Sequence, residues 1–146
     1  MYRKLLATDD NALSLIARVT IAIAIFPHGA QKLLGWFGGK GWGGTMHFFT
    51  EWGFPAFLVA LLIVTESIGM LSLALGFAGR LWASAIGVVM VVAVIKARHF
   101  NHFFMNWYAE RRGEGFEYHI LVLGLALIVL VAGSGRWSAD RALTRG

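Results

Sequence analysis

Cysteine is missing from this 146-residue chain. Within the chain, this absence excludes disulfide relays, thiolate-ligated iron–sulfur clusters, covalently attached haem and cysteine-type zinc sites. Any redox chemistry would therefore take its electrons from a bound cofactor, a substrate or another subunit.

Charged residues are also scarce. They make up 14% of the sequence and hydrophobic residues 58%, whereas soluble domains have about 25% and roughly 45–50%. A soluble fold of this size would have too little polar surface to stay dispersed, so we expect an integral membrane protein in contact with the lipid bilayer. The net charge of +5 comes from basic residues that stand singly between apolar runs. This spacing predicts headgroup anchors and no nucleic-acid partner.

Four apolar stretches are long enough to cross a bilayer core of about 30 Å, which takes about 17–25 helical residues. We predict helices over about 12–34, 54–77, 81–97 and 116–132. The expected fold class is all-α: one transmembrane domain over residues 1–146, an integral membrane four-helix bundle with two long interfacial loops on one face. Part of the first loop, residues 45–52, has the pattern of an interfacial helix. Basic residues are shared equally between the two faces, so charge does not set the orientation.

Two charged residues lie deep within the predicted spans. At about 1.5 Å per residue, Glu66 is about 18 Å from Phe54, and Arg18 is about 24 Å from Leu34. An unpaired charge at such depth is costly, so we predict an Arg18–Glu66 pair inside the bundle. The pair would either fix the helix register or take part in chemistry.

Histidines gather on the face that carries the two loops. His28 follows Pro27, which loosens the first helix, and Gln31 and Lys32 come one turn later. These side chains are interface residues bonded to loop carbonyls, or they bind a ring or carbonyl of a ligand, because a neutral imidazole exchanges protons near pH 7. Glu117 and His119 begin the last helix on the same face.

The histidines of the second long connection form a weak metal-binding pattern. The His99-x-x-His102 spacing places two imidazoles on one face of a helix, and Glu117-x-His119 lies nearby in the topology. The Glu-x-x-His pairs of di-iron bundles and the His-Glu-x-x-His of metalloproteases are absent. We therefore predict no metal site and keep His99 and His102 only as weak candidates.

Several elements along the chain form a recognisable combination: Arg18; His28-Gly29-Ala30-Gln31-Lys32-Leu33; Gly53-Phe54-Pro55; Glu66; Arg80; His99; Gly115-Phe116-Glu117-Tyr118; and Gly133-Ser134-Gly135-Arg136-Trp137-Ser138-Ala139-Asp140. Together they resemble the DoxX family of small bacterial membrane proteins, from about Leu13 to Arg141. The resemblance implies a multi-pass four-helix bundle in the bacterial inner membrane. The family name comes from a subunit of a thiosulfate:quinone oxidoreductase, and other members are associated with oxidative-stress or quinone-responsive systems, sometimes as partners of soluble enzymes.

The leading functional hypothesis is a quinone-linked redox protein or subunit, a component of an oxidoreductase. It assigns catalytic roles to His28, Glu66 and Glu117, with Arg18, Gln31, Lys32 and His119 as ligand-binding residues and quinone as the expected cofactor. The first alternative is a non-catalytic scaffold that docks a soluble redox enzyme on Trp42, Trp107, Arg111 and Arg112. The second is a small-solute or proton pathway past Arg18 and Glu66. Glycines at 69, 76, 87 and 124 would also permit a homo-oligomer.

Overall fold

The computed structural model of the protein describes residues 6–96, 102–106, 108 and 115–144. Helices account for most of these residues, and no strand occurs among them. The prediction of an all-helical fold is therefore confirmed.

The first helix, α2, covers Ala12–Leu34 and is closed by clear signals at both ends. The side chain of Asn11 accepts a hydrogen bond from the backbone N–H of Ser14 at 2.8 Å, which satisfies one of the free donors at a helix start. At the other end Gly35 adopts a left-handed conformation with φ 75°, which glycine does without a steric penalty. Pro27 lies inside the helix.

The second long helix contains a local change of winding. It runs from Ala56 to Leu75 as α4 (Ala56–Val64), a single π-helical segment η2 (Thr65–Gly69) and α5 (Met70–Leu75). Within the wider turn, the Ser67 hydroxyl donates to the carbonyl of Ile63 at 2.6 Å. Such π-turns occur frequently at functional sites, because they displace backbone groups from the regular helical pattern.

Two further helices, α6 (Gly79–Lys96) and α7 (Glu117–Ala132), complete the core. The buried core draws residues from all four long helices, for example Ile21 of α2, Leu73 of α5, Ile86 of α6 and Val129 of α7. By length and composition α2, α4–α5 and α6 can each cross a membrane, while α7 is an apolar helix of 16 residues.

The outer surface of the helices is apolar. Large hydrophobic side chains on every long helix are exposed, among them Ile23 at 71%, Leu61 at 60% and Val131 at 70%. A patch of this extent would aggregate in water and is typical of a surface in contact with lipid. Gly69 is turned inward, where a Cβ would overlap the ring of Trp82, whereas a Cβ on Gly124 would meet open space.

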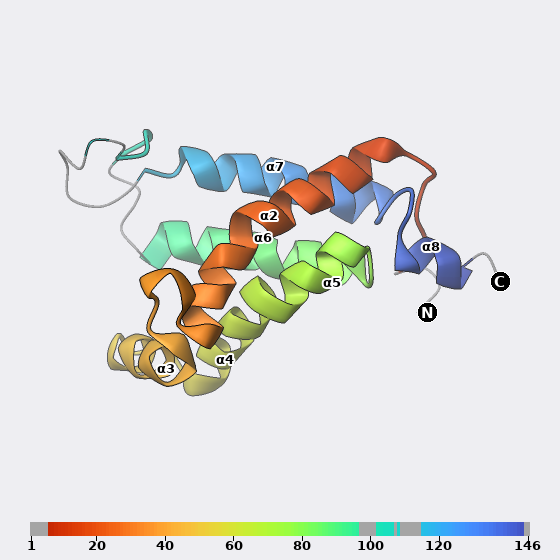
Figure 1. Ribbon diagram of the computed structural model, residues 1–146. Helices are drawn as coiled ribbons and strands as arrows, with labels where there is room; N and C mark the ends of the chain where they lie inside the picture. The colour runs from red at the N-terminus through yellow and green to blue at the C-terminus, as the bar shows by residue number, and fades with distance from the viewer. Residues whose placement is uncertain (1–5, 97–101, 107, 109–114, 145–146) are drawn as a thin grey trace.

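The two ends of the molecule differ in structure (Figure 1). The connection end carries η1 (Trp36–Gly38), α3 (Gly41–Glu51) and the start of α7. The terminal end carries the start of α2 and the short helix α8 (Ala139–Thr144). In the first connection, the helix α3 begins four residues before the stretch 45–52 that the sequence pattern marks as helical.

Candidate functional site

A buried ion pair joins α2 to the π-turn. The ammonium of Lys32 lies 2.5 Å from Oε2 of Glu66, and the side chain of Glu66 is only 7% exposed. Lys32 is in the last turn of α2, and its Nζ also approaches the carbonyl of His28 at 3.5 Å. Lys32 is 21% exposed, so its aliphatic stem is covered while its charged end reaches inward.

Direct backbone contact between α2 and η2 brings these two groups together. A Cβ on Gly29 would overlap the backbone carbonyl of Glu66. Only glycine permits this approach, and Pro27 just before it removes a backbone N–H from the helix. The helices therefore cross where one has lost a hydrogen-bond donor and the other is wound as a π-turn.

Two more side chains surround the pair. His28 is exposed on α2 beside the crossing and is close enough to Lys32 and Glu66 to interact electrostatically with both. Tyr118 of α7 interacts electrostatically with Glu66, and its hydroxyl is buried with no hydrogen-bond partner among the described residues. We call these four residues, His28, Lys32, Glu66 and Tyr118, the proton site, because each side chain carries an ionisable group.

The predicted Arg18–Glu66 pair is wrong. Arg18 is 1% exposed, but its guanidinium lies at the terminal end and donates to backbone carbonyls. Its acceptors are Ser134 at 2.9 Å, Trp137 at 2.8 Å, Arg136 at 3.3 Å, Leu73 at 3.4 Å and Ala74. The planar guanidinium, with five donors, suits such a ring of acceptors. Glu66 is left to pair with Lys32.

The loop that binds Arg18 is held by a second buried group, Asp140. Its carboxylate accepts from the backbone N–H groups of Ala78 and Gly79 at 2.7 and 3.0 Å, and from the Ser134 hydroxyl at 2.5 Å. The two backbone donors lie at the start of α6, where a negative charge is favourable. Arg18, Asp140 and Ser134 form what we call the arginine clamp, which ties α2, α5, α6 and α7 together.

Part of the sequence that forms these two sites matches a known family. The family model described as DoxX matches residues 13–99, which is more than half of the chain. The chain belongs to the DoxX family. No curated protein and no solved structure gives a significant match. Family membership and the long apolar helices together identify a membrane protein.

The DoxX match covers only some of the residues that form the two sites. It contains Arg18, His28, Lys32 and Glu66, and it ends before Tyr118. The Gly133–Asp140 element, which supplies the loop carbonyls and carboxylate of the arginine clamp, also lies beyond the matched residues.

Three other predicted site residues of this DoxX chain lie at the connection end. Gln31 donates to the carbonyl of Phe37 at 3.3 Å. The carboxylate of Glu117 accepts from the backbone N–H of Met105 at 2.9 Å, so this side chain holds the described part of the second connection. His119 is buried, with its ring edge-on to Tyr118.

The described residues contain no group of three or more His, Asp or Glu side chains that could hold a metal ion. His102 is half-buried. The other weak candidate, His99, lies outside the described residues.

Proposed function

We propose that α2, α4–α5, α6 and α7 all cross the bacterial inner membrane as one four-helix domain. The shared core and the apolar outer surface support this arrangement. At about 1.5 Å per residue, the 16 residues of α7 span about 24 Å, so flanking residues at the interface would complete its crossing.

We further propose that the chain is a quinone-linked redox protein or subunit, and that the proton site is where a lipid-soluble quinone is bound. The observation that carries this proposal is the buried Lys32–Glu66 pair with His28 exposed beside it. An exposed imidazole on a lipid-facing helix would be reached from within the bilayer. Ionisable residues inside membrane spans usually mark functional sites because they are costly to retain.

The side chains fit the needs of such a ligand. His28 would donate a hydrogen bond to a ring carbonyl, and Lys32 would supply positive charge nearby. Glu66 would exchange protons with the ligand. Tyr118 adds a buried hydroxyl that can hydrogen-bond to Glu66 or to the ligand. A bound quinone would supply two-electron, two-proton chemistry, and the electrons would come from a substrate, a bound cofactor or a partner enzyme.

Quinone binding tests this proposal. Thermal unfolding of the detergent-purified protein would be followed with a short-chain benzoquinone and a short-chain naphthoquinone, alongside His28→Ala. A ligand at 100 times its Kd stabilises the folded state by about 2.7 kcal/mol, and His28→Ala should reduce this gain. The matched control is His47→Ala, an exposed histidine of α3 at the same end. No stabilisation by any quinone would remove the basis of the proposal.

A scaffold function is the second candidate, and the exposed aromatic residues of the connection end favour it. Trp36, Phe37, Trp42 and Trp52 are 55%, 68%, 43% and 61% exposed. Trp107, Arg111 and Arg112, which this hypothesis also uses, lie outside the described residues. A scaffold would lose its activity in cells with Trp42→Ala and keep it with His28→Ala and Glu66→Gln, which is the reverse of the quinone proposal.

A further inference from the structure

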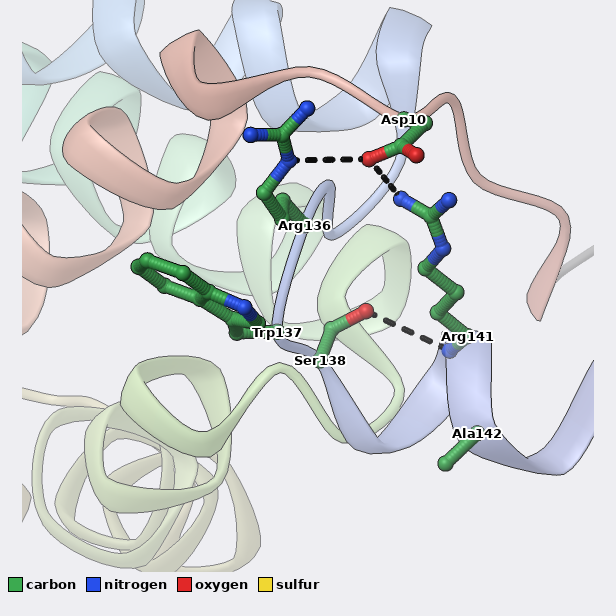
Figure 2. A pocket seen from close by; sticks show the side chains of 6 residues that line it. All are labelled: Asp10, Arg136, Trp137, Ser138, Arg141 and Ala142. Carbon is green, nitrogen blue, oxygen red and sulfur yellow. Dashed lines mark hydrogen bonds and ion pairs between the residues drawn. The ribbon is translucent and has the colours of Figure 1, made fainter.

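A cavity that contains charged side chains lies at the terminal end of the molecule. It has a volume of about 430 Å³ and is lined by Asp10, Arg136, Trp137, Ser138, Arg141 and Ala142. Figure 2 shows that Arg136 and Arg141 point toward the same carboxylate, that of Asp10. The cavity is built from the segment before α2, the loop after α7 and helix α8.

The charges in this cavity do not cancel. Two guanidinium groups share one carboxylate oxygen, because Arg136 Nε lies 3.0 Å from Asp10 Oδ1 and Arg141 Nη1 pairs with the same atom. The three groups carry a net charge of about +1, since Asp10 offsets only one of the two arginines. One phosphodiester group would neutralise the remainder, and the planar guanidinium is well suited to binding phosphate.

The backbone fixes the positions of these groups. The N–H of Arg136 donates to the carbonyl of Asn11 at 2.9 Å, and the N–H of Arg141 donates to the Ser138 hydroxyl at 3.2 Å. The carbonyls of Arg136 and Trp137 are bound by the buried Arg18. Arg136 is therefore held by a hydrogen-bonded loop, and Arg141 is presented by helix α8.

An exposed aromatic side chain lines the cavity. Trp137 is 80% exposed and has φ 53°, a left-handed conformation that is unfavourable for a residue with a Cβ. In a membrane protein, an indole at the end of the helices lies at the level of the lipid headgroups. Phosphate-binding groups beside such side chains match a lipid better than a soluble ion.

We propose that this cavity binds the headgroup of an anionic phospholipid, with the phosphodiester on Arg136 and Arg141 and the acyl chains running down past Trp137. The proposal needs the terminal end to lie at a membrane surface and does not depend on quinone chemistry. It commits to a lipid as the occupant, and a soluble phosphate ester is an outcome of the test.

The test measures lipid-dependent thermal stability of the full chain purified in detergent. Phosphatidylglycerol and phosphatidylcholine with the same acyl chains would be titrated in parallel, together with soluble glycerophosphoglycerol. We expect stabilisation by phosphatidylglycerol well above that by phosphatidylcholine, and little effect of the soluble headgroup. Arg136→Gln should weaken the phosphatidylglycerol effect about tenfold in apparent affinity, as expected for loss of a charged hydrogen bond.

Two further variants distinguish lipid binding in this cavity from general electrostatic attraction between the protein and anionic lipid. Lys40→Gln removes one positive charge from an exposed position at the opposite end and should leave the lipid effect unchanged. Trp137→Gly retains the left-handed conformation without the indole and should weaken lipid binding while the fold is kept. Equal effects of Arg136→Gln and Lys40→Gln, or equal stabilisation by both lipids, would overturn the proposal. Equal stabilisation by the soluble headgroup would overturn the assignment to a lipid.

Discussion

The same helix, α2, places one cation at each end of the molecule, the buried Arg18 and the partly buried Lys32, and the two bind different kinds of acceptor. Arg18 donates to five backbone carbonyls, which have no proton to exchange and no charge to lose. Lys32 binds the carboxylate of Glu66, which can be protonated. A buried cation satisfied by backbone is part of the structure, whereas one satisfied by a titratable side chain can take part in chemistry.

Backbone hydrogen bonding also differs between the surroundings of Arg18 and those of Lys32. The arginine clamp is built from loops whose N–H and C=O groups are used in hydrogen bonds to Arg18 and Asp140. The proton site lies on a π-turn and beside Pro27, where backbone bonding is irregular. We infer that the arginine clamp at the terminal end maintains the fold and that the proton site at the connection end carries the proposed redox chemistry. Each variant below tests that division.

Loss of Arg18 should have the largest effect on stability. Arg18→Ala leaves several buried carbonyls without a donor, so we expect a loss of more than about 3 kcal/mol in the free energy of unfolding. Arg18→Lys should recover part of this loss, because an ammonium has three donors and no planar fork. Denaturant unfolding in detergent measures both variants. A loss below about 0.5 kcal/mol in Arg18→Ala would contradict the clamp.

A larger side chain at Gly29, where α2 crosses η2, should have the next largest effect on stability. A methyl group at Gly29 would collide with the carbonyl of Glu66, so Gly29→Ala should destabilise the protein by about 3 kcal/mol and separate Lys32 from Glu66. Gly124→Ala is the matched control, because a Cβ there meets open space and alanine favours a helix. Equal stability of the two variants would show that the close crossing does not exist.

Removing the carboxylate of Asp140 should cost about 2 kcal/mol, the upper range for loss of a helix N-cap. Asp140→Ala leaves the N–H groups of Ala78 and Gly79 without their acceptor. Thermal unfolding would record the loss. The proton site should be unaffected, because it lies at the opposite end of the helices.

Glu66→Gln should change stability little, by about 1 kcal/mol, because the partly exposed Lys32 can turn toward the membrane surface. Activity in cells should nevertheless be lost, since the amide cannot carry a proton. Glu66→Leu removes hydrogen bonding as well and should be less stable than Glu66→Gln. If Glu66→Gln retains full activity, packing and hydrogen bonding at this position are sufficient.

The smallest effect is expected at the surface cluster around Asp10. Hydrogen bonds from Arg141, and next from Arg136, hold the pKa of Asp10 well below its usual value. Because the folded-state pKa is depressed, the cluster stabilises the protein above the unfolded pKa of about 4, and the contribution is lost as pH falls through the lower folded value. The stability difference between the native protein and Asp10→Asn should therefore shrink as pH falls below about 4. A difference independent of pH would contradict this assignment.

Helix termini could be anticipated from the sequence because their signals are local. Asn11 and Gly35 bound α2 by side-chain capping and a left-handed turn. The partners of Arg18 could not be anticipated, because its acceptors are backbone carbonyls, which have no side-chain signature in the sequence. Depth counted along straight helices also placed Arg18 opposite Glu66, although α2 approaches η2 at Gly29. Tyr118 was missed as a site residue because one tyrosine at a helix start resembles an interfacial residue.

The most direct test compares quinone-induced thermal stabilisation in Glu66→Gln and Asp140→Ala with that of the native protein. We predict that Asp140→Ala melts at a lower temperature and keeps the quinone-induced shift. Glu66→Gln should melt close to the native temperature and lose the shift. If the shift survives in Glu66→Gln, or disappears in Asp140→Ala alone, then the ligand does not act at the Lys32–Glu66 pair and the division between the two ends is wrong.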